Sequence, residues 1–520
     1  MLALTQLLTR AALINGEATA TVFGERRQSW NQLQERVARL AGGLQGLGLA
    51  ADDRVAILAL NSDRYLECSF GIPWAGGIAQ PINTRLAPPE IVHWLGDSGA
   101  RFLLIDRNFV EVLNGIRSEL PDLETAIFLD DGELPAGLQS YESLLAGAEP
   151  VPDAGRGDED LAQLMYTGGT TGRSKGVELS HRAIVSNVLQ CLPGLRLDED
   201  SRCLHAAPMF HAADNFFCMC ATAAAATQVI VPGFEPVSTM ATITAERVNS
   251  ALLVPTMINM LVNHQALGEH DLACLETVVY GASPMPEQVL RRAMSVLPKT
   301  EFVQAYGQTE AGPVLTMLAA RDHVLDGPNA GRVRSAGRPV ACVDMEIRDE
   351  HDRPLPPGEI GEICARGPNL MSGYRNLPEV TEETLRGGWL HTGDGAYMDE
   401  HGYVFIVDRM KDVIVSGAEN VYSAETENAL YQHPAVAECA VIGIPHDTWG
   451  EQVHAVVRLK PDTSATADEL IAHCHELIAG YKCPRSIDFR DEPLPLSGAG
   501  KILKRSLREP FWEGHTRKVH

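Results

Sequence analysis

The sequence lacks a long uninterrupted apolar stretch, so it offers no candidate for a membrane-spanning helix. Its longest apolar region, residues 216–231, is broken by Thr222, Thr227 and Gln228, and it is shorter than the roughly 20 residues that a spanning helix needs. We interpret this region as a buried helix that leads into a strand. Residues 1–10 are apolar but include Arg10 and lack a basic leader, so we expect an amphipathic first helix rather than a secretion signal.

Basic residues are also scarce. The chain of 520 residues has 43 lysines and arginines against 68 aspartates and glutamates, a formal net charge of -25, and no basic block interrupts this excess. Nucleic acids and anionic membrane surfaces are bound by concentrated positive charge, so we expect neither as a general partner. A local basic pocket for a phosphorylated substrate is compatible with this composition.

Cysteine pairs with metal-binding or redox spacing are missing. The 11 cysteines are scattered, and the closest pair, Cys218 and Cys220, has neither spacing. We expect reduced thiols that behave as small buried apolar residues, which favours a cytoplasmic location. Sequence repeats of 20–50 residues are absent too, which excludes repeat architectures.

The chain does contain alternating helical patterns and short apolar runs. A helix is predicted at 29–49, where Ser29 and Gln32 form a capping box. Strands are predicted at 54–60, 101–105, 126–129, 161–165, 228–231, 251–254, 277–280 and 302–305. This alternation indicates an α/β fold whose βα-layered parallel sheets are covered on both faces. Such sheets bind ligands beyond the carboxyl ends of their strands.

Beyond residue 330 the predicted strands are shorter and separated by glycines. They cover residues 344–348, 361–366 and 403–407 and indicate a β-rich subdomain. From Asp408 onwards a βαβ-like pattern continues to the C-terminus. We therefore predict a large N-terminal domain over residues 1–408 and a small α+β C-terminal domain over residues 409–520.

A glycine-rich loop follows the predicted strand 161–165 and is the first candidate binding site. Its glycines let successive N–H groups face one anion, its threonines add hydroxyl donors and its lysine adds positive charge. The residues expected to hold phosphate are Thr167, Gly168, Gly169, Thr170, Thr171, Gly172 and Lys175. A flexible surface turn is the alternative. A Walker P-loop is excluded, because Ser174 and Gly176 flank Lys175 where that motif needs Gly before the lysine and Ser or Thr after it.

Two further loops directly follow predicted strands. Residues 281–283 come after the strand at 277–280, and residues 306–310 come after the strand at 302–305. The carboxyl ends of parallel strands lie at one edge of a sheet, so we expect these loops and the glycine-rich loop to converge on one site.

Nine motifs stand in an order that resembles the adenylate-forming superfamily of acyl-CoA synthetases, peptide-synthetase adenylation domains and firefly-type luciferases. They occupy residues 166–176, 208–211, 280–284, 306–310, 361–374, 389–394, 408–412, 416–420 and 500–501. The resemblance covers nearly the whole chain. It implies a large N-terminal part with a small mobile C-terminal domain. It also implies two half-reactions, in which a carboxylate attacks ATP to give an acyl-adenylate and a thiol then displaces AMP.

The resemblance assigns catalytic and nucleotide-binding roles. Lys501, Glu310 and Thr309 match catalytic positions. Glu310 also matches the ligand of Mg²⁺, for which a hard carboxylate oxygen is suited. Besides the glycine-rich loop, the ATP- and AMP-binding positions are Gly281, Ala282, Ser283, Ala305, Tyr306, Gly307, Thr309, Asp394 and Arg409. Asp394 would accept from the ribose hydroxyls, and Tyr306 would stack on adenine. Taken singly, these residues have plainer alternatives: a surface carboxylate, an exposed lysine, a turn aspartate and a core tyrosine.

The resemblance also places an acyl pocket and a thiol channel. The predicted acyl pocket contains His211, Phe216, Gly281 and Gly307, although His211 could instead be a satisfied core histidine. Asp408 matches the hinge between domains, and Ser416, Gly417 and Ala418 match the loop beside the pantetheine channel. The sequence departs from the family pattern at four positions, Gly168, Ser174, Ala418 and Ala499, and none of these departures removes a charged catalytic group.

We predict an AMP-forming ligase that joins a medium- or long-chain fatty acid, or a similar apolar carboxylic acid, to CoA with ATP and Mg²⁺. One alternative is a stand-alone adenylation enzyme that passes an aryl or amino acid to a carrier-protein thiol, with Asp214 as the candidate carboxylate facing a substrate ammonium. Another is a nucleotide-binding protein without catalysis. The expected partners are small molecules, and a homodimer is left open.

Overall fold

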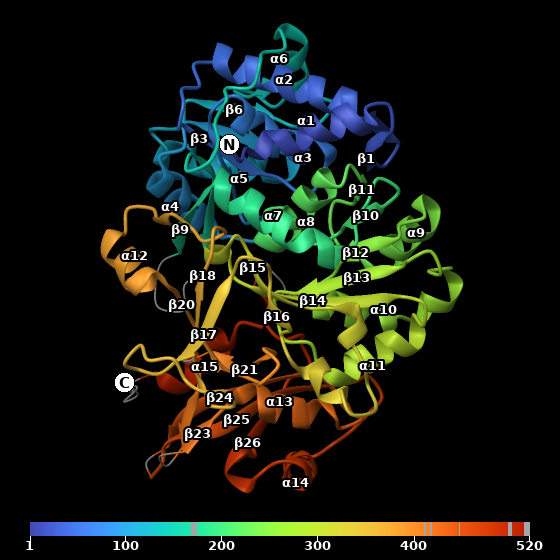
Figure 1. Cartoon of the computed structure of the whole chain (residues 1–520), viewed down its shortest axis with the longest axis vertical. Coiled ribbons are helices and arrows are strands. Elements are labelled where there is room, and N and C mark those ends of the chain that lie inside the picture. The colour runs from blue at the N-terminus through green and yellow to red at the C-terminus, as the bar shows by residue number, and fades with distance from the viewer. Residues whose placement is uncertain (168–173, 410–411, 417–418, 447, 498–501, 514–520) are drawn as a thin grey trace.

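The computed structural model describes residues 1–520 except 168–173, 410–411, 417–418, 447, 498–501 and 514–520. The fold is mixed α/β. Figure 1 shows the N-terminal third of the chain at one end of the molecule, the middle third beside it, and the last hundred residues at the opposite end. Nine of the 11 cysteines are buried, as the sequence predicts.

The first large sheet has eight strands and carries the stem of the glycine-rich loop. Its strand order is β19, β9, β8, β4, β3, β5, β6 and β7. The strands run from β3 (Arg54–Leu58) through β4 (Ile78–Pro81), β5 (Phe102–Ile105), β6 (Thr125–Phe128), β7 (Gln139–Ser140), β8 (Leu161–Thr167) and β9 (Lys175–Ser180) to β19 (Gly373–Tyr374). Strands β3 to β8 pair in parallel, whereas β8 and β9 form an antiparallel hairpin.

The second large sheet has nine strands in the order β16, β15, β14, β13, β12, β10, β11, β1 and β2. These strands are β1 (Thr19–Phe23), β2 (Arg26–Ser29), β10 (Arg202–His205), β11 (Thr227–Ile230), β12 (Ser250–Leu252), β13 (Thr277–Gly281), β14 (Glu301–Gly307), β15 (Val314–Leu318) and β16 (Arg338–Pro339). The predicted strands at 228–231, 251–254, 277–280 and 302–305 therefore form, and their ends differ from the prediction by at most two residues.

Helices cover both faces of the two large sheets. The main apolar cluster lies between the sheets and includes residues of α1 (Leu4–Asn15), α2 (Trp30–Gly46), α3 (Asp63–Trp74), α7 (His181–Leu195) and α8 (Ala212–Ala223). The outer face of the nine-stranded sheet packs against α9 (Pro236–Glu246), α10 (Pro255–Val262) and α11 (Glu287–Val296). The outer face of the eight-stranded sheet packs against α4 (Pro88–Ser98) and α5 (Val110–Ile116). This layering confirms the predicted α/β class.

Several local predictions are also confirmed. The side chains of Ser29 and Gln32 form the expected capping box at the start of α2. Residues 216–231 form the end of α8 and then β11, a buried helix that leads into a strand. The first helix, α1, buries one face that includes Leu4, Leu8 and Ala11. No described helix is both long and apolar enough to cross a membrane.

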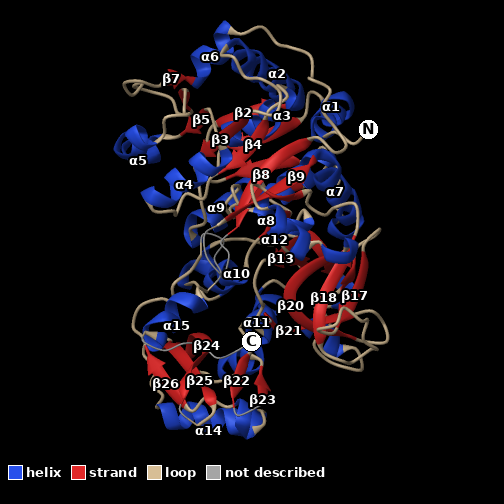
Figure 2. Ribbon diagram, turned by 90° about the vertical axis from the view of Figure 1, so that its left-hand side faces the viewer, coloured by secondary structure: helices blue, strands red, loops and turns tan. Residues whose placement is uncertain are grey.

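Two smaller sheets complete the described chain. A four-stranded antiparallel sheet contains β17 (Asp344–Arg348), β18 (Gly361–Arg366), β20 (Leu390–Met398) and β21 (Val404–Arg409), and α12 (Pro378–Thr384) precedes β20. The C-terminal sheet contains β22 (Ile414–Ser416), β23 (Glu419–Val421), β24 (Val436–His446), β25 (Gly450–Leu459) and β26 (Ser486–Phe489), with α13 (Ser423–Tyr431), α14 (Ala467–Leu477) and α15 (Lys504–Trp512). Figure 2 shows these two sheets as separate layers. Strands β25 and β26 are parallel and joined through α14, the expected βαβ unit.

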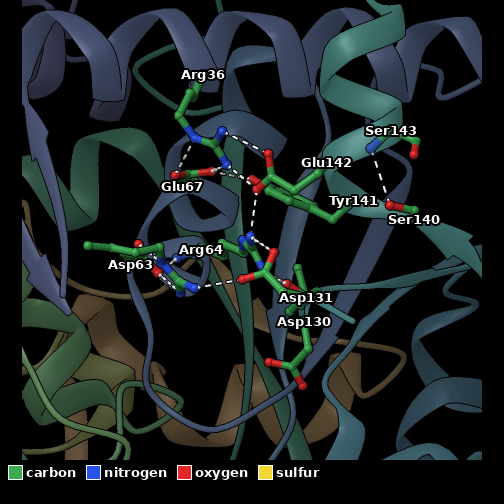
Figure 3. A network of polar contacts seen from close by, with 12 residues as sticks. Arg36, Asp63, Arg64, Glu67, Asp130, Asp131, Ser140, Tyr141, Glu142 and Ser143 are labelled. Carbon is green, nitrogen blue, oxygen red and sulfur yellow. Dashed lines mark hydrogen bonds and ion pairs between the residues drawn. The ribbon is translucent and has the colours of Figure 1, made fainter. Parts of the chain in front are cut away.

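A polar network ties α2, α3 and α6 (Tyr141–Gly147) together (Figure 3). Several of its residues, among them Arg36, Arg64 and Glu142, line a hollow of about 690 Å³. The guanidinium of Arg36 bonds Glu67 at 2.7 Å and Glu142 at 2.7 Å, and Arg64 bonds Glu142 at 2.8 Å. Tyr141 donates to the buried Glu67 at 2.7 Å. Each arginine of this set faces a carboxylate, so the hollow carries balanced charge and we interpret it as structural rather than as an anion site.

Candidate active site

The glycine-rich loop is the tip of a hairpin. Its stem pairs Thr167 on β8 with Lys175 on β9, and the predicted phosphate ligands Gly168, Gly169, Thr170, Thr171 and Gly172 lie outside the described residues. Tyr166, just before the tip, stacks on Trp94 of α4 with ring centroids 4.8 Å apart. Its hydroxyl donates to Asp97 at 2.6 Å. The stem is therefore fixed to α4 on one side of the sheet.

A tyrosine joins this hairpin to the predicted metal ligand. The Lys175 ammonium lies 4.0 Å from the ring centroid of Tyr374, and the Tyr374 hydroxyl donates to Glu310 Oε1 at 2.8 Å. Burial, and next the negative charge of Glu310, raise the pKa of the Tyr374 hydroxyl, so it stays a donor at neutral pH. Two of the three predicted loops thus meet through one side chain.

Sequence reasoning gave Tyr374 no role, although it lies within one of the nine motifs. Its position depends on β19 pairing with β9, which places Tyr374 opposite Val177. The main chain adds a second link, because Met371 N–H donates to the Glu310 carbonyl at 2.9 Å. Strands β19 and β9 are almost 200 residues apart in the chain, so no local sequence pattern predicts that they pair. Before the structure, the position of Tyr374 in the motif at residues 361–374 was the one indication of its importance.

We expect Tyr374→Phe to lower kcat/KM for ATP by roughly tenfold, because Glu310 loses the hydrogen bond that orients it. The measurement is the rate of AMP formation against ATP and Mg²⁺ concentration. Tyr403→Phe is the matched control, since the Tyr403 hydroxyl also donates to a buried carboxylate, Asp322, at 2.9 Å. An equal loss in both variants would show that Tyr374 acts only on stability.

The predicted nucleotide residues on β13 and β14 lie side by side. Gly281 pairs with Ala305, and a Cβ on Gly281 would lie 2.1 Å from the Ala305 carbonyl oxygen. A Cβ on Gly307 would lie 1.9 Å from the Pro313 carbonyl oxygen. Ala282 has a φ of 65°, a conformation that bulky residues avoid. These small residues are therefore required by the close backbone approach, and Ser283 follows them directly.

Asp394 is held by two of its predicted neighbours. The Tyr306 hydroxyl donates to Asp394 Oδ2 at 2.7 Å, and the Arg409 guanidinium lies 3.4 Å from Asp394 Oδ1. Burial raises the pKa of the Tyr306 hydroxyl, so it remains protonated. Glu362 accepts from Gly393 N–H at 2.8 Å and fixes the turn that carries Asp394. Sequence reasoning had not assigned a role to Glu362.

Two residues of the predicted acyl pocket lie on or beside α8. His211 is the N-cap, and its ring Nδ1 accepts from Ala213 N–H at 3.3 Å. Phe216 is buried in the cluster between the two large sheets, against which Ala305 and Tyr306 also pack. Phe216 therefore shares an apolar cluster with the predicted adenine side of the site.

The predicted hinge residue binds the start of α13. Asp408 accepts from both the N–H and the hydroxyl of Ser423 at 2.6 Å. The ammonium of Lys504, on α15, lies 2.8 Å from the carboxylate of Glu427, on α13. Ser416 is buried at the end of β22, whereas Gly417 and Ala418 lie outside the described residues. Asp408 thus links β21 to the C-terminal sheet and its helices.

Lys501 also lies outside the described residues, but the base of its loop is placed. A bridge between Leu496 and Ile502 closes the loop, and Arg85 donates to the Ser497 carbonyl at 3.1 Å. Arg85 follows β4, and β4 and β8 are parallel neighbours, so their carboxyl ends lie at the same sheet edge. The loop of Lys501 is therefore anchored at the edge where the glycine-rich hairpin begins.

Glu310 fits the role of a Mg²⁺ ligand. It lies in a 3₁₀ turn, η4 (Thr309–Ala311), and is 8% exposed. Tyr374 occupies Oε1, and no described residue hydrogen-bonds Oε2. The Oε2 atom of this oriented carboxylate is thus available to bind a metal, and the adjacent residue, Thr309, adds a hydroxyl. Hard oxygen donors of this kind suit Mg²⁺.

Known proteins resemble this chain in sequence and in fold. The chain matches the family model of the AMP-binding enzyme over residues 8–375 and that of the AMP-binding enzyme C-terminal domain over residues 425–501. A feruloyl-CoA synthase of an Amycolatopsis species is 40% identical over 507 residues, which are 96% of this chain and 98% of that protein. A second relative, from Streptomyces coeruleorubidus, is named a fatty acid–[acyl-carrier-protein] ligase. It is 37% identical over 500 residues, which are 95% of this chain and 94% of that protein. The crystal structure of an anthranilate CoA ligase with bound anthranoyl-AMP has a TM-score of 0.91 at 28% identity and covers 98% of each chain.

Proposed function

The chain belongs to the family of AMP-binding enzymes and is an AMP-forming acid–thiol ligase, and from this premise we propose that it joins an apolar carboxylic acid to coenzyme A through an acyl-adenylate. The observation that carries the proposal is the bridge from Lys175 through Tyr374 to Glu310. Through Tyr374, this bridge holds the ammonium of the glycine-rich hairpin close to the carboxylate that would bind the metal.

The proposed reaction has two steps. A carboxylate oxygen of the acid forms a bond to the α-phosphorus of ATP, and the bond from that phosphorus to the bridging oxygen breaks, so that pyrophosphate leaves. The thiolate sulfur of CoA then attacks the acyl carbonyl and AMP leaves. Both reactants of the first step are anions, so positive charge at the phosphates is the main requirement.

We assign that charge to Lys175 from the hairpin and to Lys501 from the C-terminal domain, residues 409–520. Glu310 and Thr309 would hold Mg²⁺, which when bound screens the phosphate charge. Asp394 would accept from the ribose hydroxyls, oriented by Tyr306 and Arg409. The small residues Gly281 and Gly307 would let the nucleotide and the acyl group approach the backbone.

For the acid, we propose a medium- or long-chain fatty acid as the first candidate. Phe216 and the apolar cluster around it support an apolar pocket wall. A hydroxycinnamic or related aryl acid is the second candidate, because a relative with 40% identity is named a feruloyl-CoA synthase.

For the acceptor, we propose free CoA, with a phosphopantetheinyl carrier protein as the alternative that the fatty-acid ligase at 37% identity supports.

Activation of an amino acid is less well supported. That role needs a carboxylate facing the substrate ammonium, and Asp214 is fully buried with its Oδ2 3.2 Å from His205. Its carboxylate is therefore engaged within the core.

The test incubates the protein with ATP, Mg²⁺, CoA and a panel of fatty, hydroxycinnamic, benzoic and amino acids. AMP and acyl-CoA are then quantified by chromatography and mass spectrometry. We expect both products, in equal amounts, for at least one apolar acid. A carrier protein bearing its phosphopantetheine arm replaces CoA in a parallel series. If AMP forms without acyl-CoA, the carrier protein rather than CoA is the thiol acceptor. If no acid gives AMP, the proposal is contradicted.

A further inference from the structure

A second group of polar side chains lies deep in the core, apart from the proposed active site. His205 is the last residue of β10, and Asp214 and Cys218 lie one turn apart on α8. The three side chains are at most 1% exposed. The His205 Nδ1 atom is 3.2 Å from Asp214 Oδ2 and 3.2 Å from Cys218 Sγ, and Cys218 Sγ is 3.8 Å from Asp214 Oδ2. Three possible metal donors therefore converge.

Hydrogen bonding alone satisfies this group poorly. A single ring nitrogen either donates a proton or accepts one, so Nδ1 cannot donate to Asp214 and accept from Cys218 at the same time. Among the described residues, Asp214 Oδ1 and His205 Nε2 have no hydrogen-bond partner although both atoms are buried. Buried polar atoms without partners are costly. The cluster thus contains more acceptors than donors.

Among the described residues, no lysine or arginine compensates for the carboxylate of Asp214. Its only ion-pair partner within that part of the chain is the ring of His205. A similar trio elsewhere provides the contrast. Glu362 and Cys364 also approach one ring nitrogen, Nδ1 of His391, at 2.9 and 3.3 Å. There, however, Arg386 lies 3.5 Å from Glu362.

We propose that His205, Asp214 and Cys218 bind a divalent zinc ion as a structural site. Zinc accepts nitrogen, oxygen and thiolate ligands at about 2.0–2.3 Å in a tetrahedral arrangement, which separates neighbouring donors by roughly 3.3–3.7 Å. The three observed separations, 3.2, 3.2 and 3.8 Å, lie within 0.1 Å of the ends of that range. The unpartnered Asp214 Oδ1 can supply a further contact when the carboxylate binds through both oxygens.

Charge balance also favours a divalent ion. Binding forms a bond from zinc to sulfur, and the thiol proton of Cys218 leaves to solvent. A neutral imidazole, a thiolate and a carboxylate together carry two negative charges, which Zn²⁺ neutralises. A neutral complex is the form that a fully buried site tolerates. A monovalent ion would leave a net negative charge in the core.

The site would fasten α8 to the end of β10. The same helix is capped by His211 and carries Phe216, so zinc would fix the wall of the predicted acyl pocket without touching the reacting atoms. This site could not be predicted from the sequence, because donors nine and four residues apart on a strand and a helix do not match the usual zinc-binding spacings.

The test measures zinc in the full chain without a polyhistidine tag, produced in zinc-supplemented medium and dialysed. We expect about one zinc ion per chain, at least a fivefold loss in Cys218→Ser and in His205→Gln, and full retention in Cys364→Ser. Cobalt in place of zinc should give the thiolate charge-transfer bands and visible bands of a tetrahedral site, and both should vanish in Cys218→Ser.

Zinc content is independent of ligase activity, so this test and the acid panel can fail separately. If the variants do not fold, the wild-type chain refolded with zinc is compared with the chain refolded with a chelator, and the zinc-loaded form should melt at a higher temperature. No zinc in the wild type, equal zinc in Cys218→Ser, or identical melting of the two refolded forms would overturn the proposal.

Discussion

Replacing Lys501 with alanine is expected to lower the rate of acyl-adenylate formation by about two to three orders of magnitude while leaving the second half-reaction largely intact. In the first step this ammonium would lie between the acid and the α-phosphate, where two anions meet. In the second step AMP is already a leaving group. The measurement is pyrophosphate exchange into ATP for the first step and CoA acylation from a synthetic acyl-adenylate for the second.

Lys460→Ala is the matched control for Lys501→Ala. Lys460 is an exposed lysine of the same C-terminal region, and its ammonium donates to the Pro434 carbonyl at 2.8 Å. We expect it to leave both half-reactions unchanged. An equal fall of both half-reactions in Lys501→Ala would reject the assigned role and point to a general loss of folding or of domain closure.

Glu310→Gln should have the second-largest effect, a loss of about 100-fold in kcat/KM for ATP. The amide keeps the shape of the side chain and can still accept from the Tyr374 hydroxyl, but it removes the charge that would attract Mg²⁺. The concentration of Mg²⁺ needed for half-maximal rate should rise as well. The measurement is AMP formation across a Mg²⁺ series at fixed ATP.

Asp322→Asn is the matched control for Glu310→Gln. Asp322 is 5% exposed and accepts from the Tyr403 hydroxyl at 2.9 Å, so it resembles Glu310 in burial and in its partner. We expect this variant to lose stability without a change in its Mg²⁺ requirement. If both variants shifted that requirement equally, Glu310 would not be the metal ligand.

The sequence predicted the parts of the site that arise from local patterns. The strand ahead of the glycine-rich loop and the two loops after β13 and β14 form where the apolar runs end. The loops after β13 and β14 lie side by side because those two strands pair in parallel, whereas β8 belongs to the other large sheet and reaches them through the packing of the two sheets. The capping box at Ser29 also arises from a local pattern, since its chemistry is confined to four consecutive residues.

Contacts between segments that are far apart in the chain could not be predicted from local patterns. Tyr374 reaches Glu310 through a strand pairing with β9, and Arg85 reaches Ser497 across the boundary predicted at Asp408. The convergence of His205, Asp214 and Cys218 depends on how α8 packs on β10. In each case the decisive distance is set by tertiary packing, which no short window of sequence encodes.

The central claim, an acyl-adenylate intermediate, is tested most directly by isotope transfer. The acid selected by the panel is labelled with ¹⁸O in both carboxylate oxygens and converted with ATP and CoA. We predict that AMP acquires one ¹⁸O atom per turnover, because a carboxylate oxygen bonds to the α-phosphorus and stays there when the thiol displaces AMP. Label in inorganic phosphate with none in AMP would indicate an acyl-phosphate route and would contradict the account.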